Sequence, residues 1–419
     1  MDKKGFALIL IVFLSSLFLI TGVYLVKTGI IEFKLAKSLE RYQYATRLAS
    51  DCITEIMRQF SQNPYEDHYS SENIERETSI REFGFTEVEI IPNRNIHTLF
   101  IEATGKYGED PSFPETKRRL EIVIKFISDL TTYGTYLNGN FTTSASNVTY
   151  YGKMWINGNW KITGWNVKCV GGPVFVKGNI TGNLTIDGDL YYGGSKGSGI
   201  VVLGNAYNYF PLGDFPTLDT EYYKIHYNYK FTHSDALPTE DPWWETLKYV
   251  RIDFNSDGTF TVNGSSTYSI PEEGCIIYGE NTNIRVSGTV KGRVTVMVSK
   301  TSYGRGVIKV RGNLNYANGT HYASSDCSFA ALAKGGIRFR GLSKSGMQVH
   351  GVYFYDTTSG YMYASNKYWK GTFSLYGTRN RGIYISRFRG STIEFDPYLD
   401  MYPPPGLPER PNLTSWKFK

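Results

Sequence analysis

The apolar residues of the chain are most concentrated near its beginning. An uncharged run from Phe6 to Val26, FALILIVFLSSLFLITGVYLV, follows the basic pair Lys3 and Lys4. A helix of this length spans about 30 Å, the thickness of the bilayer hydrocarbon. No small-x-small cleavage motif follows the run, and no cysteine stands where a lipoprotein signal needs one. We therefore predict a membrane-spanning helix over residues 6–26, retained after processing.

After the run, apolar residues recur at spacings of three and four, which places them on one stripe of a helix. The stripe consists of Leu35, Leu39, Tyr42, Ala45, Ala49, Cys52, Ile53, Ile56 and Phe60. Pro64 ends the pattern, because proline cannot continue a helix. We predict that residues 27–63 continue the first helix to a total length of about 87 Å. Its stripe should pack on the domain that follows.

Residues 64–130 carry a polar loop and then three segments with strand character, at 85–91, 99–104 and 119–126. The third alternates strictly, because Leu120, Ile122, Ile124 and Phe126 fall on one face. The pattern predicts a small antiparallel sheet that covers the apolar stripe of the helix.

Residues 131–400 repeat a unit in which a glycine lies between two apolar residues and usually has Asn or Asp beside it. The units lie at 137–141, 156–160, 176–180, 186–190, 286–290, 310–314 and 349–353. Short strands broken at glycines can stack as coils of a β-solenoid. Asn-Gly and Asp-Gly are also strong β-hairpin signals, so a β-sandwich is the alternative. The expected fold class is α+β, a long helix with a small antiparallel sheet and then a mainly β domain.

Two segments depart from this repeat. Residues 207–278 contain prolines and aromatic clusters, and we interpret them as an insertion into the β-rich domain. Residues 401–419 begin with a proline-rich tail, which should end regular strand pairing because proline donates no hydrogen bond to a ladder.

Composition and charge narrow the classes of function. With 43 Gly and 15% aromatic residues, the chain is typical of turn-rich β proteins. Its net charge of +6 is spread over 419 residues without a basic block, so we expect no nucleic-acid partner. The four cysteines are too dispersed for a disulfide scaffold or a C-x-x-C zinc site. One bridge, between Cys275 and Cys327, is compatible with an extracytoplasmic domain.

Candidate chemistry is sparse. Asp253, Asn255 and Asp257 match the first half of a calcium loop, but Gly264 stands where the bidentate glutamate belongs. Alternating strand residues on both sides favour a plain hairpin turn there. We find neither a G-x-S-x-G nor a P-loop pattern. We therefore predict no enzyme, no metal and no cofactor, and keep an envelope polysaccharide enzyme as an alternative.

The first residues carry a family resemblance. Lys4-Gly5-Phe6-Ala7-Leu8-Ile9 resembles the processing site of type IV pilins and pseudopilins, above all of minor pilins, over about residues 1–60. The resemblance implies that residues 1–5 are a leader that a prepilin peptidase removes after Gly5. It also implies that Phe6 becomes N-methylated and that the amino terminus faces the cytoplasm. The glycine-broken repeats are similar to a domain of unknown function that accompanies pilin-like amino termini.

One position departs from the resemblance. Major pilins carry a glutamate at the fifth mature position, which pairs with a neighbour's amino terminus, whereas this chain has Leu10. An unpaired charge in hydrocarbon is costly, so a place in the main shaft of a filament is disfavoured. Tip or initiator positions, or no filament at all, fit better.

The expected protein is thus a single-pass, pilin-like component of the inner or cytoplasmic membrane, with its β-rich domain outside the cytoplasm. Other pilins or pseudopilins are its expected partners. The alternative is an adhesin that binds glycans or other surfaces, because sugar C–H faces stack on aromatic rings. The proposed binding residues are Tyr222, Tyr223, Trp243 and Trp244, and the further aromatic candidates are Trp155, Trp160, Trp165 and Trp369.

Overall fold

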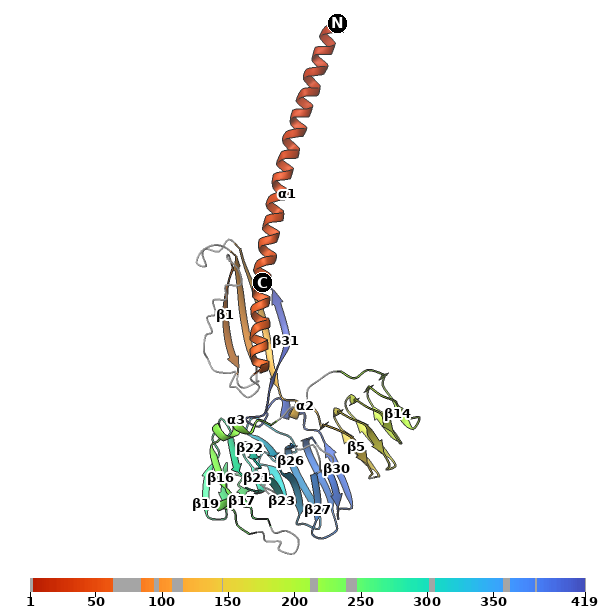
Figure 1. Cartoon of the computed structure of the whole chain (residues 1–419), viewed down its shortest axis with the longest axis vertical. Helices are drawn as coiled ribbons and strands as arrows, with labels where there is room; N and C mark the ends of the chain where they lie inside the picture. The colour runs from red at the N-terminus through yellow and green to blue at the C-terminus, as the bar shows by residue number, and fades with distance from the viewer. Residues whose placement is uncertain are drawn as a thin grey trace.

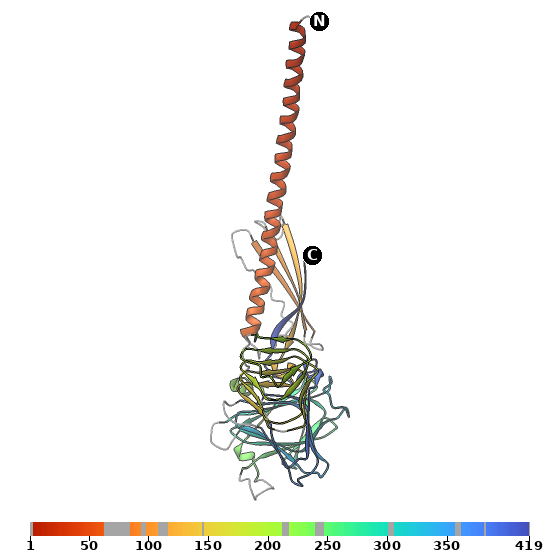
Figure 2. The same ribbon diagram turned by 90° about the vertical axis from the view of Figure 1, so that its right-hand side faces the viewer.

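A computed structural model of the chain describes residues 3–62, 84–93, 98–107, 116–144, 146–211, 218–238, 247–300, 306–356, 362–380 and 383–418. A long helix leads into a small sheet, and a large β region lies across the far end of both (Figure 1). Turned by 90°, the β region is seen along the direction in which its strands stack (Figure 2). The chain therefore has a stalk and a broad head.

The stalk is α1 (Lys3–Gln62), a single helix of 60 residues. Its large apolar side chains from Leu10 to Leu39 are exposed, whereas Ala45, Ala49 and Ile56 are buried. The predicted long helix is confirmed. Its two halves differ because only the second has a protein surface to pack against.

That surface is a four-stranded antiparallel sheet in the order β1-β2-β3-β31. Its strands are β1 (Gly84–Asn93), β2 (Thr98–Tyr107), β3 (Thr116–Ile127) and β31 (Arg410–Phe418). Leu120, Ile122, Ile124 and Phe126 face the helix and share one core with Ile56. The alternation seen in the sequence thus marks the face that covers α1.

The last strand corrects one prediction. β31 pairs antiparallel with β3, so the proline-rich tail does not end regular pairing. The prolines do not prevent it, because four of the five in the tail precede the strand and Pro411 lies at its second position, opposite Phe126. β31 is an edge strand, so only the N–H groups that face β3 must donate to the ladder, and proline is tolerated at the other positions.

After α2 (Asp129–Thr132), residues 135–207 form a stack of short strands, here called the short stack. Its strands are β4 (Thr135–Leu137), β5 (Phe141–Thr143), β6 (Val148–Tyr151), β7 (Met154–Ile156), β8 (Trp160–Ile162), β9 (Val167–Val170), β10 (Val174–Val176), β11 (Ile180–Thr181), β12 (Leu184–Asp187), β13 (Leu190–Tyr192), β14 (Ile200–Val202) and β15 (Ala206–Tyr207). Strands pair in parallel with their equivalents one repeat later, as in the series Thr135, Met154, Val174, Leu190 and Ala206.

The chain then passes through α3 (Thr220–Ile225) into a second set of parallel pairings, the long stack. Its strands are β16 (Tyr229–Thr232), β17 (Val250–Phe254), β20 (Cys275–Glu280), β21 (Ile284–Val290), β22 (Gly292–Val298), β23 (Val307–Tyr316), β24 (Cys327–Ala333), β25 (Gly336–Gly341), β26 (Gly346–Tyr355), β27 (Met362–Asn366), β28 (Thr372–Arg379), β29 (Ile383–Ser386) and β30 (Gly390–Glu394). The short 3-10 helices η2 (His233–Asp235) and η3 (Pro397–Asp400) flank it.

The two stacks are continuous with one another. Arg379 of β28 pairs in parallel with Thr135 of β4, and Ile393 of β30 pairs with Tyr150 of β6. The last repeat of the long stack therefore lies beside the first repeat of the short stack, and strands of both belong to one 24-stranded sheet, while β5, β8 and β11 form a separate three-stranded sheet. The chain enters the head at this junction, builds outward, and returns to it (Figure 1).

Residues 207–278 are only in part the predicted insertion. β16 pairs in parallel with β20, and β17 pairs in parallel with β21, so both strands belong to the long stack. The antiparallel strands β18 (Thr259–Val262) and β19 (Ser266–Ser269) project beside them. Prolines interrupt the glycine repeat here without interrupting the parallel pairing, and this hid the two strands in the sequence.

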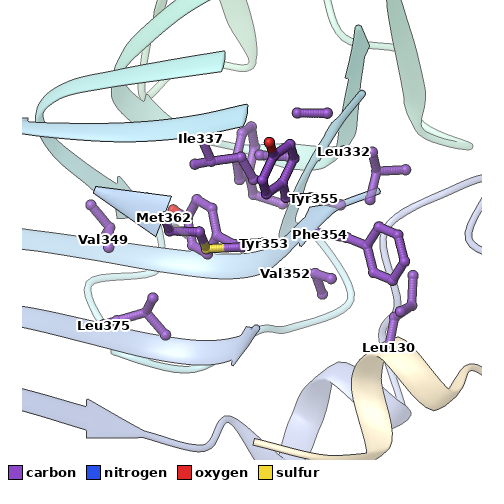
Figure 3. Close-up of a cluster of buried hydrophobic side chains, with 14 of the residues drawn as sticks. Leu130, Leu332, Ile337, Val349, Val352, Tyr353, Phe354, Tyr355, Met362 and Leu375 are labelled. Atoms are coloured by element: carbon purple, nitrogen blue, oxygen red, sulfur yellow. The ribbon is translucent and has the colours of Figure 1, made fainter. Parts of the chain in front are cut away.

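The interior of the head is apolar. Tyr353, Phe354, Met362 and Leu375 are buried between neighbouring strands of the long stack, and Leu130 of α2 packs against the same cluster (Figure 3). One core therefore extends from the junction with the stalk into the long stack.

Candidate functional site

The first half of α1 is an exposed apolar helix that needs apolar surroundings. It is long and apolar enough to cross a membrane, with a mean hydropathy of 2.1 over its most apolar 18-residue window, none of which is buried. Gly5 and Phe6 lie in the first turns of the helix, and Leu10 is exposed. The residues expected to be processed and those expected to span the membrane thus occupy one uninterrupted helix.

The second half of α1 is held to the small sheet by close backbone packing. A Cβ atom added at Gly105 of β2 would overlap the carbonyl oxygen of Ala45, so glycine permits the helix to approach the strand. Phe60 packs edge-on against Phe126, with ring centroids 5.4 Å apart. The Arg118 guanidinium lies 4.0 Å from the ring centroid of Tyr42. The helix is therefore fixed along the length of the sheet.

The predicted aromatic binding residues differ in exposure and in their contacts. Trp243 and Trp244 lie outside the described residues. Tyr223 is fully buried, and its hydroxyl donates a hydrogen bond of 2.5 Å to the carbonyl of Gly406. Tyr222 is half-buried and stacks on His226 at 4.5 Å. The prediction that Tyr223 binds at the surface is wrong, because this side chain anchors the carboxy-terminal tail.

Other aromatic residues form a ladder on the short stack. Parallel register brings five rings into one column, namely Tyr136, Trp155, Phe175, Tyr191 and Tyr207. Phe175 stacks on Tyr191, and Tyr191 on Tyr207, each with 4.8 Å between ring centroids. The faces of these inner rings are occupied by one another. The ladder therefore stabilises the stack, and the stacked faces of its rings are not open to a ligand.

The tryptophans separate by exposure. Trp155 and Trp160 are buried in the short stack, whereas Trp165 and Trp369 are each 63% exposed. Trp369 lies in the turn between β27 and β28, and the Arg387 guanidinium carbon is 4.4 Å from its ring centroid. An exposed indole beside a guanidinium is an arrangement that can bind ligands through both ring contacts and charge.

A group of titratable residues that the sequence did not suggest lies on the long stack. His350 Nδ1 is 2.8 Å from the carbonyl oxygen of Leu314, so it must be the donor. Its Nε2 therefore accepts, and His321 Nδ1 donates to it across 3.2 Å. Tyr376 stacks on His321 at 4.2 Å and on His350 at 5.1 Å. Burial lowers the pKa of the His350 imidazole to about 4 and so keeps it neutral at pH 7.

Two carboxylates lie at the next repeat. Tyr322 donates a hydrogen bond of 2.7 Å to Glu394, and this bond raises the pKa of Tyr322 to about 12. Burial raises the pKa of the Asp396 carboxyl to about 6, and its oxygens accept from the backbone N–H groups of Ala323 and Tyr398. These contacts fasten the loop 317–326 to the end of the long stack. The carboxylate oxygens serve the fold, and no signal in the sequence links them to Tyr322 and Ala323, because these partners lie 72 and 73 residues earlier.

The half calcium loop is a hairpin turn, as predicted. β17 and β18 pair antiparallel on either side of it. Asp253 accepts from Arg285 and Ser287, while Asp257 accepts from the backbone and hydroxyl of Thr259, at 3.0 and 2.7 Å. These bonds to Thr259 lower the pKa of Asp257. Among the residues that the structure describes, no group of three or more His, Cys, Asp or Glu side chains is placed to hold a metal ion.

The possible Cys275–Cys327 bridge does not form, since both cysteines are buried free thiols. Cys275 lies in β20 and Cys327 in β24, and β22 pairs with both of these strands from between them. Strands two apart are separated by about 10 Å, and a disulfide needs Cα atoms within about 7 Å. Burial raises the pKa of the Cys275 thiol to about 12.

No protein-family model and no curated protein matches the chain. The solved structures that resemble it include the crystal structure of the competence-associated pilin ComZ from Thermus thermophilus. The two chains are 12% identical, and the match covers 90% of this chain and 97% of that one, with a TM-score of 0.36. Chains that superpose at this level need not share a fold, so the similarity by itself assigns neither a family nor a function.

Proposed function

We propose that this chain is a pilin-like protein that is anchored in the membrane by residues 6–26 and displays its β-rich head outside the cytoplasm. The observation that carries the proposal is the change in the exposure of apolar side chains along α1. Leu39 is 56% exposed and the large apolar residues before it are exposed as well, whereas Ala45, Ala49 and Ile56 are buried on the small sheet. Each Leu, Ile, Val or Phe left in water forgoes about 1.5–3 kcal/mol. A lipid bilayer removes that cost for the side chains of residues 6–26.

The processing residues support the pilin-like part of the proposal. Gly5 stands directly before the apolar run and Phe6 begins it, in the order that the resemblance to type IV pilins requires. A prepilin peptidase is the implied partner, together with other pilins or pseudopilins. Leu10 lies where a main-shaft subunit would carry its glutamate, and we therefore propose a minor, tip or initiator role.

We infer further that the head is a β-solenoid without catalytic activity. The in-register parallel pairings of both stacks favour coils over sandwich hairpins, because a sandwich is built mainly from antiparallel pairs. The carboxylates near the junction, Glu394 and Asp396, hold a tyrosine and backbone amides, which favours a structural role. A display function needs only the rigid surface that such a stack provides.

Membrane fractionation tests the anchor. We expect the protein to sediment with membranes, to resist extraction by alkaline carbonate, and to be released by detergent. Replacing Leu17 and Leu19 by arginine should move most of the protein to the soluble fraction, because each arginine near the centre of a spanning helix costs about 2.5–3.5 kcal/mol. Leu35→Arg, on the exposed part of α1 beyond the predicted span, is the matched control and should stay in the membrane. Soluble wild-type protein, or equal retention of all variants, would contradict the proposed anchor.

A further inference from the structure

Three consecutive turns of the long stack lie on top of one another. They are residues 342–345 between β25 and β26, 367–371 between β27 and β28, and 387–389 between β29 and β30. The Thr372 N–H donates to Ser345 at 3.3 Å, and the Arg389 N–H donates to Gly371 at 2.9 Å. Asn366 donates to the carbonyl of Ser343 at 2.9 Å. The parallel register thus assembles one continuous surface, here called the basic aromatic corner.

The middle turn presents two aromatic rings. Trp369 is 63% exposed and Tyr368 is 41% exposed. The buried Asn366 fixes their backbone, because its side chain accepts from the N–H of Tyr368 at 3.0 Å and donates to the carbonyl of Lys370 at 2.5 Å. The turn that carries the rings is therefore preorganised, which reduces the conformational entropy that would be lost on binding a ligand.

Two residues of the corner adopt a backbone conformation that costs energy. Trp369 has φ of 56° and Arg387 has φ of 63°, in the left-handed region that residues with a side chain rarely adopt. The guanidinium of Arg387 lies 4.4 Å from the indole centroid. Strain of this kind concentrates at ligand sites. Here it turns a large apolar side chain outward instead of into the core.

The charge of the corner is of one sign. With one flanking residue added at each end, the three turns cover residues 341–346, 366–372 and 386–390. These segments contain no Asp or Glu, and their cations are Lys344, Lys367, Lys370, Arg387 and Arg389. All of these cations except the half-buried Arg387 are exposed. A second pair of rings lies on the adjoining strands, where Tyr384 stacks on Tyr363 at 5.8 Å. The three turns therefore combine five cations with the two exposed rings of Tyr368 and Trp369, and the exposed ring of Tyr384 lies on an adjoining strand.

We propose that the basic aromatic corner binds acidic polysaccharides. A pyranose ring can place its C–H face on the Trp369 indole, while the surrounding Lys and Arg side chains pair with the carboxylates or sulfates of the polymer. A single-stranded nucleic acid is disfavoured, because its binding sites stack successive bases along a long basic groove. The corner instead offers two rings in one turn on a chain of modest net charge. This proposal gives the adhesin alternative a ligand class and a location, and it does not depend on the membrane anchor.

Binding by the full-length chain in detergent micelles tests this site, with alginate as the acidic polymer, dextran as the neutral one and a single-stranded oligonucleotide as the competing class. We expect alginate to bind with an affinity that falls as salt rises, and dextran to bind at least tenfold more weakly. Trp369→Ala should weaken alginate binding at least tenfold, and Trp369→Phe should restore part of it. Replacing Lys367 and Lys370 together by glutamine should weaken binding and flatten its salt dependence.

Matched controls come from the short stack. Trp165→Ala removes an equally exposed indole, and a double replacement of the exposed Lys161 and Lys168 by glutamine removes two charges. Both should leave alginate binding within twofold of the wild type. Three results would each overturn the proposal: equal binding of alginate and dextran, alginate binding unchanged in both corner variants, or tighter binding of the oligonucleotide with the same dependence on Trp369. Because the protein is in micelles throughout, these results are independent of membrane retention and processing.

Discussion

Replacement of Trp160 by alanine is expected to destabilise the short stack by about 3–5 kcal/mol. Trp160 of β8 is fully buried, and its ring stacks on Phe141 with centroids 5.6 Å apart. Its Nε1–H donates to the hydroxyl of Thr143 at 3.0 Å, and this hydroxyl also contacts Tyr150 at 3.1 Å. The variant loses a fully buried indole ring and leaves a cavity that the strands on each side cannot close.

Pulse proteolysis in urea measures this effect on the full-length protein in detergent. The midpoint for cleavage within residues 135–207 should fall by about 1 M or more. Trp165→Ala is the matched control, because this tryptophan belongs to the same stack and is largely exposed. Its midpoint should stay near that of the wild type, since surface substitutions change stability by about 0.5 kcal/mol or less. Equal effects of the two substitutions would show that Trp160 is not part of a packed core.

The second large effect is expected for Gly105→Ala, which should destabilise the contact between α1 and the small sheet by about 3 kcal/mol. The new methyl group would overlap the carbonyl oxygen of Ala45, and the backbone N of Ala49 lies 3.0 Å from the same point. Both partners are helix backbone, so no side chain can move aside. The helix must shift away from β2 and uncover part of the core that includes Ile56 and Phe126.

Hydrogen exchange read by mass spectrometry resolves this loss. Amides of residues 45–60 and of β2 should exchange at least tenfold faster in Gly105→Ala than in the wild type. Gly29→Ala is the control, because a Cβ atom at Gly29 meets nothing within 4 Å and alanine favours the helix. Unchanged exchange in Gly105→Ala would contradict the close packing of the helix on the sheet.

The stalk could be predicted from sequence because its signals are local. The period of three and four residues marked the stripe of α1 that is buried from Ala45 onward, but its first three members, Leu35, Leu39 and Tyr42, are exposed, so that part of the prediction is wrong. The strict alternation of residues 120–126 marked the face of β3. The three expected strands fall within β1, β2 and β3. β31 was missed because its pairing with β3 joins positions about 290 residues apart, and proline at its second residue argued for a loop.

The surfaces of the head could not be predicted in the same way. Which side chains form a column depends on the length of each repeat, and this length varies along both stacks. Thr135 pairs with Met154, but Val174 pairs with Leu190. The aromatic ladder, the pair His321 and His350, and the basic aromatic corner each join residues from different repeats. For the corner one local signal existed, the sequence Lys-Tyr-Trp-Lys-Gly at residues 367–371 in a stretch without acidic residues.

The same dependence on register explains the two wrong site predictions. Cys275 and Cys327 were paired because they lie in one β-rich region, but an intervening strand separates them. Tyr223 was grouped with exposed aromatics because its neighbours in sequence are aromatic and charged. Its position on α3 turns it toward Gly406 of the returning tail. Neither contact can be read from local sequence.

The mass of the mature amino-terminal peptide, measured on protein extracted from membranes of a host that has a prepilin peptidase, tests the central claim most directly. A membrane-anchored, pilin-like chain should begin at Phe6 and carry one added methyl group. A Gly5→Leu variant should keep the leader, because the peptidase would lack its cleavage residue. A membrane-bound wild-type chain that still begins at Met1 would contradict the pilin-like account.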